Sequence, residues 1–233
     1  MRALGVIVAR GGSKGFPGKN LALLAGLPLV AHAVRCAQLC PSLARTIVST
    51  DDPGIAEAAR AAGGDVPFLR PAGLALDDTP VLPVLRHALE STGGGWDAVV
   101  LLQPTSPLRL PDDVERTVAL LAARDGLDGA VTASEPPFNP VWQLVADDGG
   151  VLRHVVEQGA AFTRRQDAPR ALVLNGLAYA WRTGFAERAG TSWFEGRNGL
   201  VETESLRAVD VDAAEDLEVC AALLAAGLVR LPW

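Results

Sequence analysis

Three cations and four glycines lie within one short segment near the start of the chain. The segment ARGGSKGFPGKN spans residues 9–20 and contains Arg10, Lys14 and Lys19; the two lysines are the only ones in the sequence. Glycines let backbone N–H groups approach an anion closely, and the cations neutralise its charge. The segment is not a Walker A loop, because Ser13 stands at the first glycine position and Asn20 follows the lysine, and it has no GxGxxG pattern. We predict a phosphate-binding loop of another type; the alternative is a flexible surface loop with incidental charges.

Two aspartates near the end of the chain form a second candidate site. VDVDAAEDLE (209–218) predicts the end of a strand followed by a helix, with Asp210 and Asp212 alternating along the extended part. Side chains two residues apart on extended backbone point to the same side. Two such carboxylates can share a hard cation such as Mg²⁺, which also binds substrate phosphates. The alternative is that Asp212 only caps the helix that follows.

Polar residues also follow three other predicted strands. STDDP (49–53) is more typical of a helix N-cap with turn acids than of a site. Arg70, ahead of LDDTP (76–80), is suited to a phosphate or ribose contact or, equally, to a surface ion pair. In QPTSPLR (103–109), two prolines hold Gln103, Thr105 and Ser106, which predicts either a rigid substrate wall or an ordered loop with an N-cap.

The elements that position these residues alternate between short apolar runs and amphipathic stretches. Strands are expected at 4–9, 45–50, 65–70, 98–103 and 129–135, and helices at 29–39, 54–62, 80–91 and 111–124. This order predicts an α/β fold with a doubly wound, mostly parallel sheet covered on both faces. Ligands of such sheets bind beyond the carboxyl ends of the strands, where the polar segments above are expected.

The alternation stops at residues 135–140. A hairpin around Asp148, Gly149 and Gly150 is expected within 142–156, then a long strand at 171–182 and a closing helix at 213–227. We therefore expect one domain over residues 1–233, with residues 136–170 forming a small excursion from the main sheet.

Composition excludes several functional classes. The net charge of −6 and the pI of about 5.1 disfavour a nucleic-acid partner. No apolar run approaches the ~18 residues of a membrane span, and the first apolar run is expected to be a strand and not a signal peptide. Cys36, Cys40 and Cys220 form no metal or disulfide pattern and are expected to be buried thiols. We expect a cytoplasmic protein.

Six segments, in their order and spacing, resemble the acylneuraminate cytidylyltransferases, the CMP-sialic acid synthetases. They are ARGGSKGFPGKN, STDD, LLQPTSPLR, FTRRQDAP, NGLAYAW and DVDAAEDL, which together run from residue 9 to residue 217. The resemblance implies a doubly wound nucleotidyltransferase fold, CTP and Mg²⁺ as requirements, CMP-sugar and pyrophosphate as products, and a homodimer. It also implies that the excursion pairs subunits, so that Arg165 could serve the neighbouring subunit's site.

The motifs and the resemblance together predict roles for individual residues. The nucleotide would be bound by Arg10, Gly11, Gly12, Ser13, Lys14, Lys19, Asn20, Arg70 and Thr79. Catalysis would depend on Arg10, Lys14, Lys19 and Asp210, and the metal would be held by Asp210 and Asp212. The acidic acceptor would face Gln103, Thr105, Ser106, Arg165, Gln166 and Asn175.

The acceptor is the least constrained part of this interpretation. A nine-carbon sugar acid is expected first, but Leu177 and Trp181 could reshape the pocket. The second candidate is a small phosphonate acid such as phosphonoformate, and the related 3-deoxy-manno-octulosonate enzymes match the motifs less closely. Two other classes use a similar sheet. A glycosyltransferase with a DxD metal site would have no use for the 9–20 loop, and a non-catalytic nucleotide-binding module would form no product.

Overall fold

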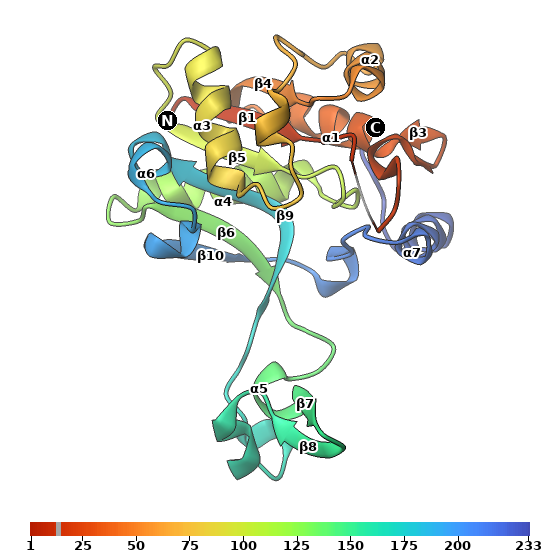
Figure 1. The fold of residues 1–233 in the computed structure, drawn as a ribbon, viewed down its shortest axis with the longest axis vertical. Helices are drawn as coiled ribbons and strands as arrows, with labels where there is room; N and C mark the ends of the chain where they lie inside the picture. Colours follow the sequence, from red (N-terminus) through yellow and green to blue (C-terminus); the bar gives the residue numbers. More distant parts are fainter. Residues whose placement is uncertain (13–14) are drawn as a thin grey trace.

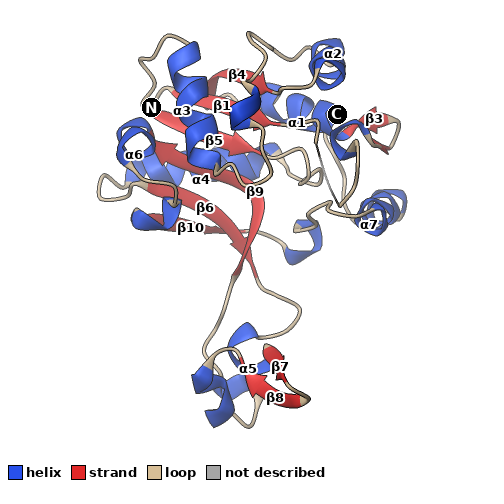
Figure 2. Ribbon diagram, viewed as in Figure 1, coloured by secondary structure: helices blue, strands red, loops and turns tan. Residues whose placement is uncertain are grey.

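A six-stranded sheet forms the centre of the molecule, in the order β10-β6-β9-β5-β1-β4 (Figures 1 and 2). The structure, a computed structural model, describes residues 1–12 and 15–233, without the side chain of Arg165. Neighbouring strands pair in parallel except at β9, which is antiparallel to both β5 and β6. The strands are β1 (Ala3–Val8), β4 (Leu43–Ser49), β5 (Ala98–Leu102), β6 (Gly129–Ser134), β9 (Val173–Arg182) and β10 (Asn198–Glu202).

Both faces of the sheet are covered by helices, as the alternation of side chains along β1 shows. Ala3 and Ile7 are buried against α1 (Leu29–Gln38), α2 (Pro53–Ala61) and α4 (Pro111–Ala123). Leu4 and Val6 are buried on the opposite face against α3 (Val81–Ser91) and α6 (Thr183–Arg188). The predicted doubly wound α/β fold with a mostly parallel sheet is therefore confirmed.

Side-chain caps fix where several helices begin. The Asp52 carboxylate accepts a hydrogen bond from Ile55 N at 2.9 Å, so the predicted N-cap of α2 is confirmed. At the start of α7 (Ala214–Ala225), the Asp216 carboxylate accepts from the backbone N–H groups of Asp212 and Ala213 at 2.9 and 2.8 Å. Asp216 rather than Asp212 thus caps this helix, and the Asp212 carboxylate is left for other contacts.

Two expectations about strands were wrong. Residues 65–70 form only an isolated bridge, at Asp65, because Pro67 has no N–H to donate to a ladder. Residues 209–213 are irregular and hydrogen-bond to the loop after β5, where Val211 N donates to Thr105 O at 2.7 Å. The sequence reading also missed β10, α6 and a two-stranded hairpin formed by β2 (Leu23–Leu24) and β3 (Leu27–Pro28).

The excursion is a small separate lobe that stands away from the sheet (Figure 1). It joins two adjacent strands, since Ser134 of β6 pairs with Val173 of β9. Residues 135–172, called the arm below, include the predicted hairpin. Its elements are α5 (Pro140–Gln143), β7 (Val145–Asp148), β8 (Val151–His154) and the 3-10 helices η3 (Glu157–Ala161) and η4 (Arg165–Asp167).

Four more 3-10 helices complete the described elements: η1 (Lys19–Leu21), η2 (Ala72–Leu74), η5 (Trp193–Glu195) and η6 (Ser205–Arg207). Within the described part of the chain, no helix is long and apolar enough to cross a membrane. All three cysteines are free and buried, as expected, and burial raises the pKa of Cys220 to about 11.

Candidate active site

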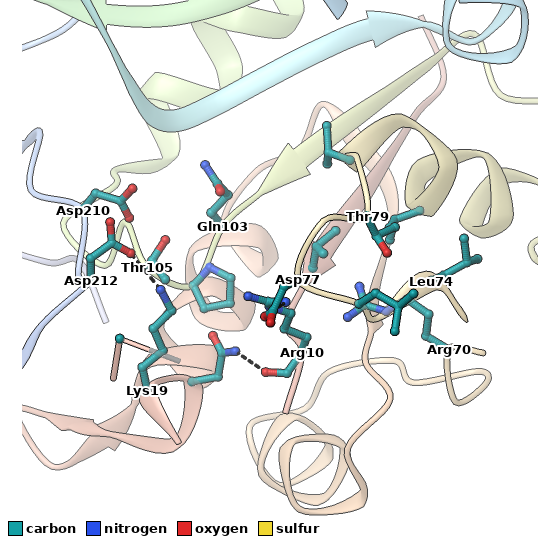
Figure 3. Close-up of a pocket in the computed structure, with 17 residues that line it drawn as sticks. Arg10, Lys19, Arg70, Leu74, Asp77, Thr79, Gln103, Thr105, Asp210 and Asp212 are labelled. Carbon is teal, nitrogen blue, oxygen red and sulfur yellow. Dashed lines mark hydrogen bonds and ion pairs between the residues drawn. The ribbon is translucent and has the colours of Figure 1, made fainter. Parts of the chain in front are cut away.

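A pocket of about 590 Å³ opens beyond the carboxyl ends of β1 and β5, where the fold class predicts a ligand (Figure 3). It collects polar side chains from four separate parts of the chain, within residues 8–20, 70–84, 103–105 and 210–212. In Figure 3, Asp210, Asp212 and Thr105 lie on one side, Arg10 and Gln103 in the middle, and Arg70 and Thr79 on the other side. Of the expected site residues, the pocket lining includes Arg10, Lys19, Asn20, Arg70, Thr79, Gln103, Thr105, Asp210 and Asp212.

The loop after β1 is fixed at both ends. The buried Asn20 donates its side-chain N–H to Arg10 O at 2.9 Å, which ties the end of the loop to its start. Gly11 N donates to the Asp51 carboxylate at 3.1 Å, and a Cβ at Gly11 would lie 2.7 Å from an Asp52 carboxylate oxygen. Gly11 is therefore required by close packing against the loop after β4. Ser13 and Lys14, which were expected to bind phosphate, lie outside the described residues.

Each cation among the described pocket residues pairs with a carboxylate. Arg10 lies 2.6 Å from Asp77, Lys19 lies 2.9 Å from Asp212, and Arg70 lies 3.5 Å from Asp51. Because Arg70 is buried, desolvation lowers the pKa of its guanidinium, and the charge of Asp51 opposes that shift. Arg70 is thus a buried pocket residue and not the surface ion pair that the sequence left open.

The two C-terminal aspartates lie side by side at the pocket edge (Figure 3). Desolvation by the pocket walls raises the pKa of Asp210 although the residue is exposed on one side, and the charges of Asp212 and Asp216 raise it further. A hydrogen bond from the Thr105 side chain and the charge of Lys19 act in the opposite direction. The arrangement gathers more negative charge than Lys19 alone balances.

The loop after β5 contributes Gln103 and Thr105 to the pocket, whereas the Ser106 side chain is fully buried behind it. Thr105 contacts the C-terminal segment twice, since its backbone oxygen accepts from Val211 N and its side chain hydrogen-bonds Asp210. The buried Arg109 fixes this loop to the sheet, because its guanidinium donates to Gln103 O and to a backbone oxygen of β9.

The sequence model of the family described as Cytidylyltransferase matches residues 4–132 of this chain. That range covers the loop after β1, β4, α3 and β5, including the expected nucleotide-binding residues. The chain belongs to the cytidylyltransferase family. It is therefore a nucleotidyltransferase, and the DxD glycosyltransferase and binding-module alternatives are not supported.

Two similar proteins extend the family assignment over nearly the whole length of this cytidylyltransferase. It is 38% identical over 155 residues to the CMP-N,N'-diacetyllegionaminic acid synthase of Legionella pneumophila, covering 65% of this chain and 66% of the relative. It is 32% identical over 249 residues to the 3-deoxy-manno-octulosonate cytidylyltransferase of Anaeromyxobacter dehalogenans, covering 97% and 100%. The resemblance to sialic-type CMP-sugar synthetases is thus confirmed.

Among solved structures, a CMP:2-keto-3-deoxy-manno-octonic acid synthetase complexed with CTP has a similar fold. The TM-score is 0.76 at 22% sequence identity, over 97% of this cytidylyltransferase and 100% of that chain. At this identity the match supports the fold alone, and it agrees with the sheet and helix arrangement described above.

Besides the buried Ser106, three other residues expected to face the acceptor are not among the described residues that line the pocket. Asn175 is buried in β9, where it donates to the Thr203 hydroxyl at 2.7 Å and lines a different cavity of about 700 Å³ at the root of the arm. Gln166 belongs to η4 on the arm and is not in the pocket lining, and the Arg165 side chain is outside the described part. These three acceptor roles remain predictions.

The residues present fit a magnesium ion that is shared with substrate phosphates. Among the described residues, no group of three His, Cys, Asp or Glu side chains could hold a metal by itself. Mg²⁺ usually binds to one or two carboxylates together with waters and phosphates. Asp210 and Asp212 supply two hard oxygen ligands with excess negative charge at the mouth of the pocket.

Sequence reasoning missed three residues of the cytidylyltransferase site. Asp51 was treated as a turn acid, Asp77 as part of an unassigned loop, and Arg109 as the end of the proline-containing segment. A single charged residue at the end of an otherwise uncharged, proline-containing run was the available signal for Arg109. Asp51 and Asp77 carried no signal, because their contacts with Gly11, Arg70 and Arg10 join residues far apart in the sequence, at separations that no periodic pattern encodes.

Proposed function

We propose that this cytidylyltransferase transfers CMP from CTP to a nine-carbon sugar acid of the legionaminic or sialic type, with release of pyrophosphate. The observation that carries the proposal is the pocket, where Arg10, Lys19 and the Asp210–Asp212 pair meet at the carboxyl ends of the strands. The acceptor class is supported by the 38% identity to a protein named as a CMP-N,N'-diacetyllegionaminic acid synthase.

The geometry suits phosphoryl chemistry by positioning and charge stabilisation. An acceptor oxygen would attack the α-phosphorus of CTP in line, forming a P–O bond as the bond to the pyrophosphate oxygen breaks. Arg10 and Lys19, on the loop side of the pocket, are placed to contact the phosphates, and Lys14 is predicted to join them. Gln103 projects from the end of β5 toward the same cavity and would orient the acceptor.

Asp210 and Asp212 would hold the magnesium ion, and Thr105 would orient Asp210 through its side-chain hydrogen bond. When bound, the ion would neutralise phosphate charge and lower the pKa of the acceptor hydroxyl. Since Lys19 pairs with Asp212 at 2.9 Å, the metal carboxylate also sets the position of the cation that faces the phosphates.

The function is tested by pyrophosphate release with Mg²⁺, each of CTP, UTP, ATP and GTP, and a panel of acids. The panel contains N-acetylneuraminate, legionaminate, pseudaminate, 3-deoxy-manno-octulosonate and phosphonoformate. Release limited to CTP with a nine-carbon acid is expected. Release with 3-deoxy-manno-octulosonate or phosphonoformate alone would keep the chemistry and replace the acceptor. No release with any pair would contradict the proposal.

The site assignment is tested by Lys19→Ala. We expect kcat to fall roughly 10²–10³-fold, the usual effect of removing one preorganised charge from a transition state. Arg45→Ala is the matched control, because Arg45 is also ion-paired, with Asp65 at 2.7 Å, but lies outside the pocket lining. Equal kcat values for the two variants would refute the role of Lys19.

A homodimer formed through the arm is part of the proposal. The arm exposes several large apolar side chains, with Val151 and Leu152 67% and 66% exposed and Val155 55% exposed. Contiguous exposed apolar residues on a projecting hairpin are typical of a protein interface. A second copy of the chain is the proposed occupant, and its arm would bring Arg165 and Gln166 to the neighbouring pocket.

A further inference from the structure

The contact between Arg10 and Asp77 joins the proposed phosphate-binding loop to a separate loop across the pocket. The guanidinium and carboxylate are 2.6 Å apart, and their side chains are 32% and 39% exposed. Figure 3 shows the pair in the middle of the pocket, between the aspartates on one side and Arg70 on the other. The cation proposed to bind the triphosphate is therefore already occupied by an anion of the same chain.

Asp77 belongs to residues 71–80, called the pocket loop below, which connects Arg70 to α3. The loop supplies Leu74, Leu76 and Thr79 to the pocket lining. Its described backbone hydrogen bonds all close local turns, such as Leu74 N to Pro71 O at 2.8 Å and Thr79 N to Leu76 O at 3.2 Å. Its position over the pocket therefore depends on side-chain contacts, and the Arg10–Asp77 ion pair is one that spans the cavity.

We propose that Asp77 is an internal competitor of the nucleotide: its carboxylate holds Arg10 and the pocket loop together in the empty enzyme, and the CTP phosphates displace it. This inference rests on the proposed function, because it takes Arg10 to be a phosphate ligand. It makes Asp77 a determinant of nucleotide affinity, through a contact that opposes binding.

The exchange is favourable for a triphosphate because its several negative charges outweigh one carboxylate at the same cation. An ion pair this exposed is weak, so it lowers affinity without preventing binding. A ligand without phosphates leaves Arg10 with Asp77 and does not meet this competition. The contact therefore affects phosphorylated and unphosphorylated ligands differently, and this difference gives the test.

The test compares Asp77→Asn with Asp78→Asn by titration calorimetry of the full chain with CTP and with cytidine, in Mg²⁺ at low salt. Asp78→Asn is the matched control, because it removes one negative charge from the same exposed loop. Asp78 itself forms no ion pair with the described residues. We expect Asp77→Asn to bind CTP about two- to fivefold more tightly than Asp78→Asn, the range that an exposed ion pair is worth. Cytidine affinity should be the same in all forms.

Hydrogen exchange of residues 71–80 without nucleotide provides a second readout. Faster exchange in Asp77→Asn than in Asp78→Asn is expected, because the loop loses its contact across the pocket. If the wild type binds CTP but Asp77→Asn shows no gain, or binds CTP more weakly, the inference is overturned and the proposed function stands. If the wild type binds no CTP, both the proposed function and the displacement of Asp77 by CTP are refuted. Hydrogen exchange of residues 71–80 then tests only whether the Arg10–Asp77 ion pair holds the pocket loop.

Discussion

Gly176 shows how one residue shapes the part of the pocket around Gln103. Its φ of +71° lies in the left-handed region, and a Cβ there would lie 2.7 Å from the Gln103 side-chain nitrogen and 3.0 Å from the Ser106 hydroxyl. Gly176 N also donates to the Tyr179 hydroxyl at 3.1 Å, which fixes the bend of β9 at this point. Only glycine leaves Gln103 its observed position.

Gly176→Ala should therefore affect both stability and substrate use. We expect a loss of about 1–2 kcal/mol from the positive φ, together with a higher KM for the acceptor because Gln103 is displaced. Urea unfolding and steady-state kinetics measure the two effects. Gly93→Ala is the control, since Gly93 has a φ of +85° and open space where a Cβ would be. It should show a similar stability loss with unchanged KM, and a KM rise in both variants would contradict the explanation.

The sequence predicted residues whose chemistry is concentrated in short segments. Arg10, Lys19 and Asn20 lie in one glycine-rich run, and Asp210 and Asp212 are two positions apart, so their types and spacing were informative. The carboxylates that pair with the cations were not predictable in the same way. Asp51 meets Arg70, and Asp77 meets Arg10, only when the segment between β4 and α3 folds back over the ends of the strands.

At the level of elements, a buried ion pair connects the C-terminal segment to α4. Arg207, on η6, donates to both oxygens of Asp113 at 2.5 and 3.0 Å, and the two side chains are 8% and 1% exposed. Asp113 also accepts from Leu110 N at 2.8 Å. The pair sets where the chain begins its path toward Asp210.

Arg207→Met should destabilise the protein by about 3–5 kcal/mol, because it leaves the Asp113 charge buried without its partner. Chemical unfolding measures the change. Arg45→Met breaks the more exposed pair with Asp65 and should cost at most about 1 kcal/mol. Similar losses for the two variants would show that burial of the Arg207 pair is not the decisive factor.

A histidine links α1 to the end of the chain and gives the fold a pH dependence. His32 is buried, with Nε2 2.8 Å from Leu24 O, and its Nδ1 accepts from the Trp233 indole N–H at 3.1 Å. This pattern requires the neutral ring with its proton on Nε2. Desolvation lowers the pKa of His32, and the bond to Leu24 O opposes the shift.

A histidine with a lowered pKa in the folded state binds fewer protons there than in the unfolded chain. Stability from His32 is therefore present above about pH 6.5 and falls as the pH drops toward the lowered pKa. The melting temperature should decrease from pH 7.5 to pH 5.5, and His32→Gln should reduce the decrease. Parallel curves for the two proteins would exclude His32 as the cause.

Periodic patterns predicted most of the elements because each is buried along a regular face. The failures have local causes that periodicity does not reveal. Pro67 interrupts the expected strand at 65–70, and residues 209–213 bind the loop after β5 instead of the sheet edge. β10 forms that edge of the sheet instead. Its residues alternate between buried and exposed because β10 pairs with β6, a long-range contact that the local sequence pattern does not contain.

At the scale of the whole molecule, the arm determines the proposed assembly. Leu152→Asp should convert a homodimer into a monomer, because it places a charge in an apolar interface. Light scattering coupled to gel filtration measures the mass. Leu228→Asp is the control, as Leu228 is 64% exposed and lies outside the arm. A monomeric wild type, or dissociation by both variants alike, would contradict an interface formed by the arm.

The pairing of Arg10, Lys19 and Arg70 with carboxylates has a consequence for how fast the nucleotide arrives. Opposite charges a few ångströms apart cancel one another beyond a Debye length, roughly 8–10 Å at physiological salt. The chain as a whole carries a net charge of −6. A polyanion approaching from solution therefore meets little attraction at long range, and electrostatic steering cannot accelerate the encounter. The association rate constant for CTP should remain in the unsteered range and vary little with ionic strength, so that discrimination takes place after contact, through dissociation rates.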